Sequence, residues 1–213
     1  MTAAVRKPRY ERRLAGDRRQ ALIDATIKSL KRHGHEGLSV RRIAAEAGVS
    51  IGLINHHFPN KNTLVAESYR HFTRQLTARF QAAVLLAPPD PRARLHAFFE
   101  AVFSRPNLDP HVLTAWIVFW GLFRQSPEIR KAHDEAGRGY GELLRALLAD
   151  LVEAAGTPRI DPRLTSIGLT ALLDGLWLEW CLDPKNFKPD EAVSLCEAWI
   201  EGLLRTTVPA TSR

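Results

Sequence analysis

Residues 39–61 of the chain read SVRRIAAEAGVSIGLINHHFPNK, and this stretch predicts two short helices joined by a tight turn. Ser39 and Ser50 are each placed to cap the start of a helix with a side-chain oxygen. Gly48 lies between the two helices, where the chain needs a residue that tolerates a left-handed conformation. We therefore expect helices over residues 40–47 and 51–57.

The second of these helices has the size and composition to enter the major groove of DNA. That groove is about 12 Å wide and admits one helix, provided that a scaffold helix fixes its angle. Ile43 of the first helix can pack on Ile54 and Phe58, which leaves an outer face with little bulk and several hydrogen-bonding groups. We predict that the DNA contacts come from Ser39, Arg41, Ser50, Ile51, Gly52, Leu53, Asn55, His56 and Lys61.

Positive charge is concentrated in the same part of the chain. The protein has 213 residues and a formal net charge of +7. Residues 1–62 contain 13 Lys or Arg and 5 Asp or Glu, whereas residues 63–213 contain 17 and 18. A polyanion bound at one end of the molecule explains this asymmetry. A solvated basic tail would account for residues 1–19, but not for the basic residues that flank the two short helices.

The rest of the sequence predicts an all-α fold. Apolar residues follow helical spacing from Arg18 to Gly34, and a long helix is expected from Lys61 towards Leu86. Further along, Asp or Ser followed by Pro marks four helix starts. We expect about nine helices, of which the last five lie near residues 91–104, 109–124, 127–155, 161–182 and 189–205.

Several classes of function are not supported by the sequence. The chain has no long uncharged apolar stretch and no secretory signal, and its two cysteines form neither a disulfide framework nor a metal site. It also has no metal-binding histidine motif, phosphate loop or nucleophile elbow. We therefore predict a cytoplasmic protein that is not an enzyme, uses no cofactor or metal and does not bind membranes.

Two tryptophan-rich segments suggest a binding site for a small molecule. TAWIVFWGLF contains Trp116, Phe119, Trp120 and Phe123, and LLDGLWLEWCL contains Asp174, Trp177, Glu179 and Trp180. Aromatic clusters most often form part of a core, and each of these residues could do only that. Indole rings beside carboxylates could instead form a cage for an organic cation, because cations are attracted to the faces of aromatic rings.

The stretch IAAEAGVSIGLINHHFPNKNTL resembles the signature of TetR-family repressors. The resemblance implies an N-terminal three-helix DNA-binding head, a larger helical body that binds a ligand, and a two-fold dimer formed by the last two helices. It matches Ser39, Ser50, Ile51, Gly52, Asn55, His56 and Lys61 to positions that commonly face DNA. The family commonly has Tyr where this chain has Asn55, which is a departure from its pattern at a DNA-facing position.

The C-terminal half, notably TAWIVFWGLF and LTALLDGLWLEW, is similar to the BetI branch of this family, whose namesake responds to choline. The similarity extends over most of the chain, from about Arg18 to Leu204. Glu179 and Trp180 stand where we would expect less acidic and less aromatic residues in the namesake, so the sequence predicts a cationic effector without assigning choline. Release of DNA and binding of DNA on ligand binding are both compatible with the sequence.

The combined prediction is a homodimeric repressor that releases a palindromic operator when a small ligand binds. A basic flexible arm over residues 1–17 would precede a helix-turn-helix domain over residues 18–62, and residues 63–213 would form the ligand-binding and dimerisation domain. The arm would add sequence-independent attraction to phosphates, although entry into a minor groove is an alternative.

Overall fold

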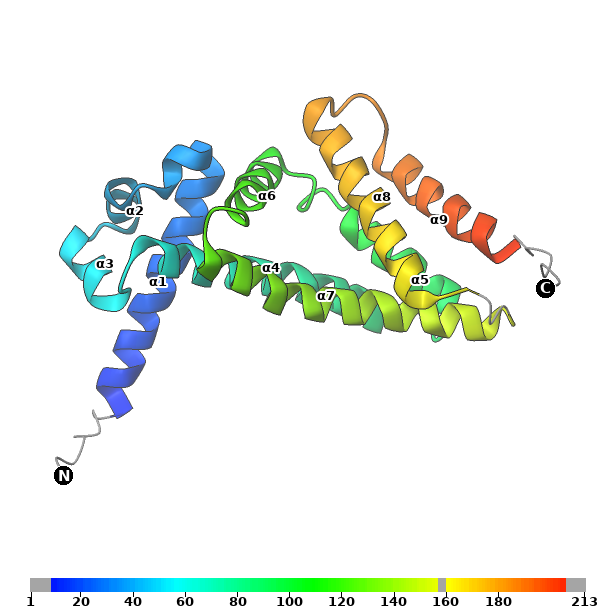
Figure 1. The fold of residues 1–213 in the computed structure, drawn as a ribbon, viewed down its shortest axis with the longest axis horizontal. Helices are drawn as coiled ribbons and strands as arrows, with labels where there is room; N and C mark the ends of the chain where they lie inside the picture. Colours follow the sequence, from blue (N-terminus) through cyan, green and yellow to red (C-terminus); the bar gives the residue numbers. More distant parts are fainter. Residues whose placement is uncertain (1–8, 157–159, 206–213) are drawn as a thin grey trace. The chain divides into compact units, whose positions relative to one another are not determined.

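The computed structural model describes residues 9–156 and 160–205, with only the backbone described for residues 9–15. These residues form nine α-helices and one 3-10 helix and contain no strand (Figure 1). The predicted all-α fold is therefore confirmed. The elements are α1 Arg9–His33, η1 Gly34–Leu38, α2 Val40–Ala47, α3 Ile51–His57, α4 Lys61–Leu86, α5 Pro91–Val102, α6 Pro110–Leu122, α7 Pro127–Ala154, α8 Pro162–Leu182 and α9 Pro189–Arg205.

The first helix begins earlier than the sequence suggested. We expected residues 1–17 to form a flexible arm, but α1 already begins at Arg9. The sequence RYERRLA has no helix-breaking residue before Gly16, and its straight-chain residues lose little side-chain freedom in a helix. The prediction was therefore wrong for residues 9–17, while residues 1–8 lie outside the described part of the chain.

The chain divides into two compact units. The N-terminal unit comprises residues 1–73 and 114–134, and the C-terminal unit comprises residues 74–113 and 135–213. The helices α4, α6 and α7 contribute to both units. The domain boundary that we predicted at residue 62 stays a prediction. The division into compact units instead falls after residues 73, 113 and 134.

The N-terminal unit is built around apolar side chains from the first four helices. Leu30 of α1, Ile43 of α2 and Leu64 of α4 are completely buried, and Ile54 of α3 is nearly so. The 3-10 helix η1, which the sequence did not predict, closes against α1. There the hydroxyl of Ser29 donates a 2.8 Å hydrogen bond to the carbonyl oxygen of Gly37.

Acidic caps start three helices that begin in the C-terminal unit, as the Asp-Pro pairs predicted, and Asp109 is the cap of α6. The side chain of Asp90 accepts a hydrogen bond from the backbone N–H of Ala93 at the start of α5, at 2.8 Å. Asp161 caps α8 in the same way. The core of this unit includes the fully buried side chains of Phe98, Phe99 and Leu144.

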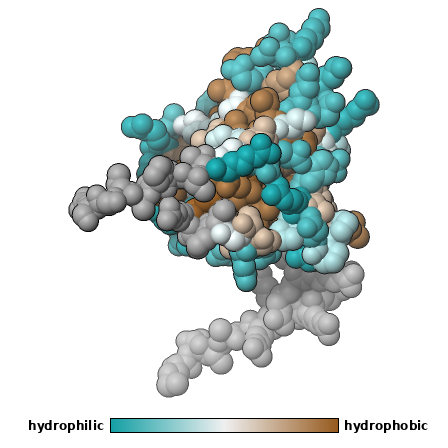
Figure 2. Space-filling model, turned by 90° about the vertical axis from the view of Figure 1, so that its right-hand side faces the viewer, coloured by the Kyte–Doolittle hydropathy of each residue, from teal (hydrophilic) through white to brown (hydrophobic). Residues whose placement is uncertain are grey.

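Close packing joins α8 to α9 in the C-terminal unit. An added Cβ at Gly168 of α8 would lie 3.0 Å from the ring of Trp199 in α9, so glycine lets the two helices approach. On their outer side, Leu164 and Ile167 of α8 are each 56% exposed and Leu195 of α9 is 52% exposed. Figure 2 shows one side of the molecule, on which apolar residues lie at the surface among hydrophilic ones. Within the described residues, no helix is long and apolar enough to cross a membrane.

Candidate nucleic-acid interface

The turn between α2 and α3 has the conformation that the sequence predicted. Gly48 adopts φ 65° and ψ 34°, which is the left-handed region that favours glycine. The Ser39 hydroxyl accepts a hydrogen bond from the backbone N–H of Arg42 at 3.2 Å, and the Ser50 hydroxyl accepts one from that of Leu53 at 3.3 Å. Both helix starts are therefore capped.

The helix α3 has one apolar side and one side open to water. Its inner residue Ile54 is 2% exposed, and the neighbouring Phe58 is 1% exposed. Leu53 is half-buried at the edge. The other predicted DNA-contacting residues are all exposed, namely Ser39, Arg41, Ser50, Ile51, Gly52, Asn55, His56 and Lys61.

Acidic residues near this surface are held by basic partners. Glu46 lies 2.7 Å from the Lys28 ammonium and 3.3 Å from an Arg32 guanidinium nitrogen. The hydrogen bond from Lys28 lowers the pKa of Glu46, so this carboxylate stays ionised and paired. Glu36 is paired with Arg42 at 3.0 Å. These pairs reduce the repulsion that a nearby polyanion would meet.

The start of α4 carries a cap that sequence reasoning missed. Asn60 accepts a 2.8 Å hydrogen bond from the backbone N–H of Thr63, and Lys61 begins the helix beside it. Asn is a favoured capping residue, so the pattern Asn60-Lys61-Asn62-Thr63 contained this signal. Lys61 is thereby placed at the positive end of a helix dipole, where an anion is favoured.

The four aromatic residues of the first tryptophan-rich segment lie in the N-terminal unit. Trp116 and Trp120 lie 6.1 Å apart between ring centroids. Phe119 is completely buried and packs edge-on against Tyr69 of α4. Phe123 stacks on the ring of His133 at 4.1 Å. In this segment, Phe119 therefore belongs to the core, whereas the rings of Trp116 and Trp120 are half-buried.

The second segment lies in the C-terminal unit. Trp177 is 7% exposed, and the indole N–H of Trp180 donates a 3.2 Å hydrogen bond to the carbonyl oxygen of Leu108. Glu179 is exposed and accepts a hydrogen bond from Asn186 at 3.4 Å. Asp174 lies at the surface of α8, but partial burial of its carboxylate raises its pKa to about 6. The eight predicted cage residues are therefore divided equally between the two units.

A tyrosine that the sequence analysis did not select lies close to Asp174. Tyr140 of α7 is hydrogen-bonded to Thr170 of α8, and burial together with the nearby Asp174 carboxylate raises the pKa of its phenol. Its ring also contacts the rings of Phe80 and Phe98. Tyr140 is a single tyrosine among glycines and polar residues of α7, and no sequence pattern marked it as a candidate functional residue.

Comparison with known proteins assigns the two parts of the chain to families. Residues 22–68 match the model described as bacterial regulatory proteins of the tetR family, and residues 91–205 match that of the BetI-type transcriptional repressor C-terminal domain. An HTH-type transcriptional regulator BetI from Yersinia pestis (strain Pestoides F) is 34% identical over 185 residues, which cover 86% of this chain and 91% of that protein. One from Burkholderia thailandensis is also 34% identical, over 88% of this chain and 93% of its own length.

Solved structures share this fold. A chain from Pseudomonas aeruginosa PAO1, described as a transcriptional regulator, is 48% identical with a TM-score of 0.82, over 89% of this chain and 91% of its own. A regulator from Saccharomonospora viridis in complex with choline is 22% identical with a TM-score of 0.75, over 87% of this chain and 96% of its own, and supports the fold alone. The chain therefore belongs to the TetR family of transcriptional regulators, with a helix-turn-helix DNA-binding domain and a BetI-type C-terminal part, and is not an enzyme.

Proposed function

We propose that this regulator is a repressor that binds a palindromic operator and releases it when a small organic cation binds. The observation that carries the DNA-binding part is the exposed face of α3, which begins directly after the left-handed turn at Gly48. This face combines Gly52, which has no side chain, and the exposed apolar Ile51 with the hydrogen-bonding groups of Asn55 and His56. Because its target is genomic DNA, we place the protein in the cytoplasm.

The mode of binding follows from the chemistry of this face. Asn55 can pair with an adenine edge through its amide, and the lack of a side chain at Gly52 lets the helix approach the bases. Lys61 would contact a phosphate and would fix the register without reading sequence. Ligand binding in the body would favour a dimer whose heads are spaced wrongly for successive grooves, which is a shift between two populations.

The test is binding of the purified protein to fragments of its own genome, with random DNA as the competitor. We expect a clear preference for a palindromic site, and no preference at moderate ionic strength would overturn the proposal. Lys61→Ala is expected to weaken binding to every sequence. Because one phosphate contact is lost, the slope of log K against log salt concentration should fall by about 0.9. Lys185→Ala, which removes an exposed lysine from the α8–α9 connection, is the matched control and should leave this slope unchanged.

For the effector, we propose that the tryptophan-rich segments bind a quaternary ammonium or amine. The residues that we propose for this role are Trp116, Phe119, Trp120, Phe123, Asp174, Trp177, Glu179 and Trp180. The relative from Saccharomonospora viridis was solved with choline, which supports a ligand of this class. The buried phenol of Tyr140 beside Asp174 adds a polar group of the kind that orients a ligand.

Binding of such a cation is expected to depend on pH through Asp174. Only the ionised carboxylate attracts a cation, and with a pKa of about 6 roughly a tenth of it is ionised at pH 5. The affinity for choline, measured by tryptophan fluorescence, should therefore be about tenfold weaker at pH 5 than at pH 8. Asp174→Asn should remove this dependence, whereas Asp183→Asn, beyond the end of α8, should keep it. Absence of a response to choline, betaine aldehyde and polyamines would contradict a cationic effector.

We further propose that the protein is a homodimer formed through α8 and α9. The outer sides of these helices carry Leu164, Ile167 and Leu195 at half exposure or more, which is costly for a protein that stays a monomer. Exposed Ala171 and Gly175 of α8 and Ala198 and Gly202 of α9 would let the helices of two copies approach closely. A two-fold dimer of this kind presents two recognition helices and thus predicts the palindrome.

A further inference from the structure

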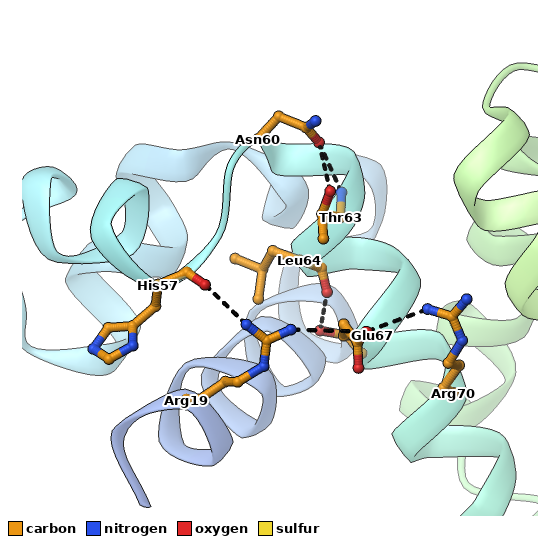
Figure 3. A network of polar contacts seen from close by, with 8 residues as sticks. Arg19, His57, Asn60, Thr63, Leu64, Glu67 and Arg70 are labelled. Carbon is orange, nitrogen blue, oxygen red and sulfur yellow. Dashed lines mark hydrogen bonds and ion pairs between the residues drawn. The ribbon is translucent and has the colours of Figure 1, made fainter. Parts of the chain in front are cut away.

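The C-terminal end of α3 is held by a residue of the first helix. One guanidinium nitrogen of Arg19, Nη1, donates a 2.8 Å hydrogen bond to the carbonyl oxygen of His57, the last residue of α3 (Figure 3). The last carbonyls of a helix have no partner within it, and a cation at this end also interacts favourably with the helix dipole. Arg19 therefore satisfies a group that α3 cannot satisfy itself.

Two further contacts fix the position of this guanidinium. Its central carbon lies 4.2 Å from the centroid of the Phe58 ring, which is buried in the core of the head. The second terminal nitrogen, Nη2, lies 3.7 Å from a carboxylate oxygen of Glu67 in α4. Glu67 is also paired with Arg70 at 3.4 Å. Arg19 thus connects α1, the end of α3 and α4 in one network (Figure 3).

The length of α3 makes such a connection important. An isolated helix of seven residues is not stable in water, so its direction depends on contacts with the rest of the head. Ser50 caps its start, and Ile54 anchors its inner side. The hydrogen bond from Arg19 is the contact that the structure gives to the carbonyl at its far end, and the planar guanidinium can serve His57 and Glu67 at the same time.

We infer that Arg19 is a positioning residue, which sets the direction of the recognition helix without contacting DNA. This inference rests on the proposed function. The side chain is only 38% exposed, and both of its terminal nitrogens are directed to protein oxygens. A residue in this role contributes to the discrimination between operator and random DNA, because only base-edge contacts need an accurate helix angle.

The test compares Arg19→Ala with Arg18→Ala, which removes the same charge from the adjacent, exposed position. For each variant, the affinity for the operator and for random DNA is measured over a range of salt concentrations. Arg19→Ala is expected to lower the ratio of the two affinities by about tenfold with an unchanged salt slope, as the loss of one charged hydrogen bond would do. Arg18→Ala should leave the ratio as it is in the parent protein.

Two results would overturn the inference. The first is an affinity ratio that stays unchanged in Arg19→Ala. The second is a salt slope that falls by about 0.9 while the affinities for operator and random DNA fall equally, because Arg19 would then be a phosphate contact. If Arg19→Ala fails to fold, Arg19→Lys keeps the charge but not the planar fork, and its affinity ratio must still fall. A parent protein without any preference for a genomic site would instead refute the proposed function.

Discussion

Replacement of Gly37 by alanine is expected to destabilise the N-terminal unit by about 3 kcal/mol and to abolish DNA binding with it. The Cβ of an alanine at this position would lie 2.3 Å from the carbonyl oxygen of Ser29 and 2.9 Å from the backbone nitrogen of Leu30. These are backbone atoms of α1, which cannot turn aside as the end of a flexible side chain can. The 3-10 helix η1 would have to move away from α1, and the buried hydrogen bond between Ser29 and Gly37 would break.

Circular dichroism at 222 nm during heating measures this effect, since the described part of the molecule is almost entirely helical. Gly16→Ala is the matched control. Gly16 lies inside α1 with no atom within 4 Å of an added Cβ, so this change should stabilise the helix by about 0.5–1 kcal/mol. A Gly37→Ala protein that melts at the temperature of the parent protein would contradict the close approach of η1 to α1.

Ile167→Glu is expected to convert the dimer to monomers and to lower operator affinity by about 100-fold or more. The residue lies in the centre of the exposed apolar side of α8, where a dimer would bury two copies of the new charge. Burying an unpaired carboxylate is far more costly than the apolar contact that it replaces. A monomer also loses the second recognition helix, and with it the gain in affinity from two linked contacts.

Sedimentation or light scattering gives the mass, and the same samples are then titrated with operator DNA. Leu85→Glu is the control, because Leu85 is 82% exposed near the end of α4 and not on α8 or α9. It should remain a dimer and bind as the parent protein does. If Ile167→Glu keeps both its mass and its affinity, the interface does not include this side of α8.

The head could be predicted from the sequence because its signals are local. Ser39, Gly48 and Ser50 each act on the backbone within a few residues, and the structure confirms all three. The Asp-Pro helix starts succeeded for the same reason. The start of α1 was placed too late because the basic composition of residues 9–17 was interpreted as an arm, although those residues have good helix propensity.

The features that were missed depend on residues far apart in the sequence. Arg19 and His57 are 38 positions apart, and no local pattern connects an arginine in the first helix with a carbonyl at the end of the third. Gly37 and Ser29 are only eight positions apart, but their approach depends on how η1 folds back onto α1. The tryptophan segments could be identified by composition, but their division between two units follows from packing that the sequence does not display.

That division has a consequence for building hybrid regulators, in which the head of one protein is fused to the sensor of another. A single crossover near residue 62 would leave residues 114–134 with the foreign sensor, although they form one unit with the head. Lys31 of α1, whose ammonium nitrogen lies 5.6 Å from the centroid of the Phe72 ring, and Gly34, which lies against the side chain of Thr114, would then meet residues of a different parent. A functional hybrid of this scaffold should be assembled from interleaved blocks, so that both parts of the N-terminal unit come from the same parent.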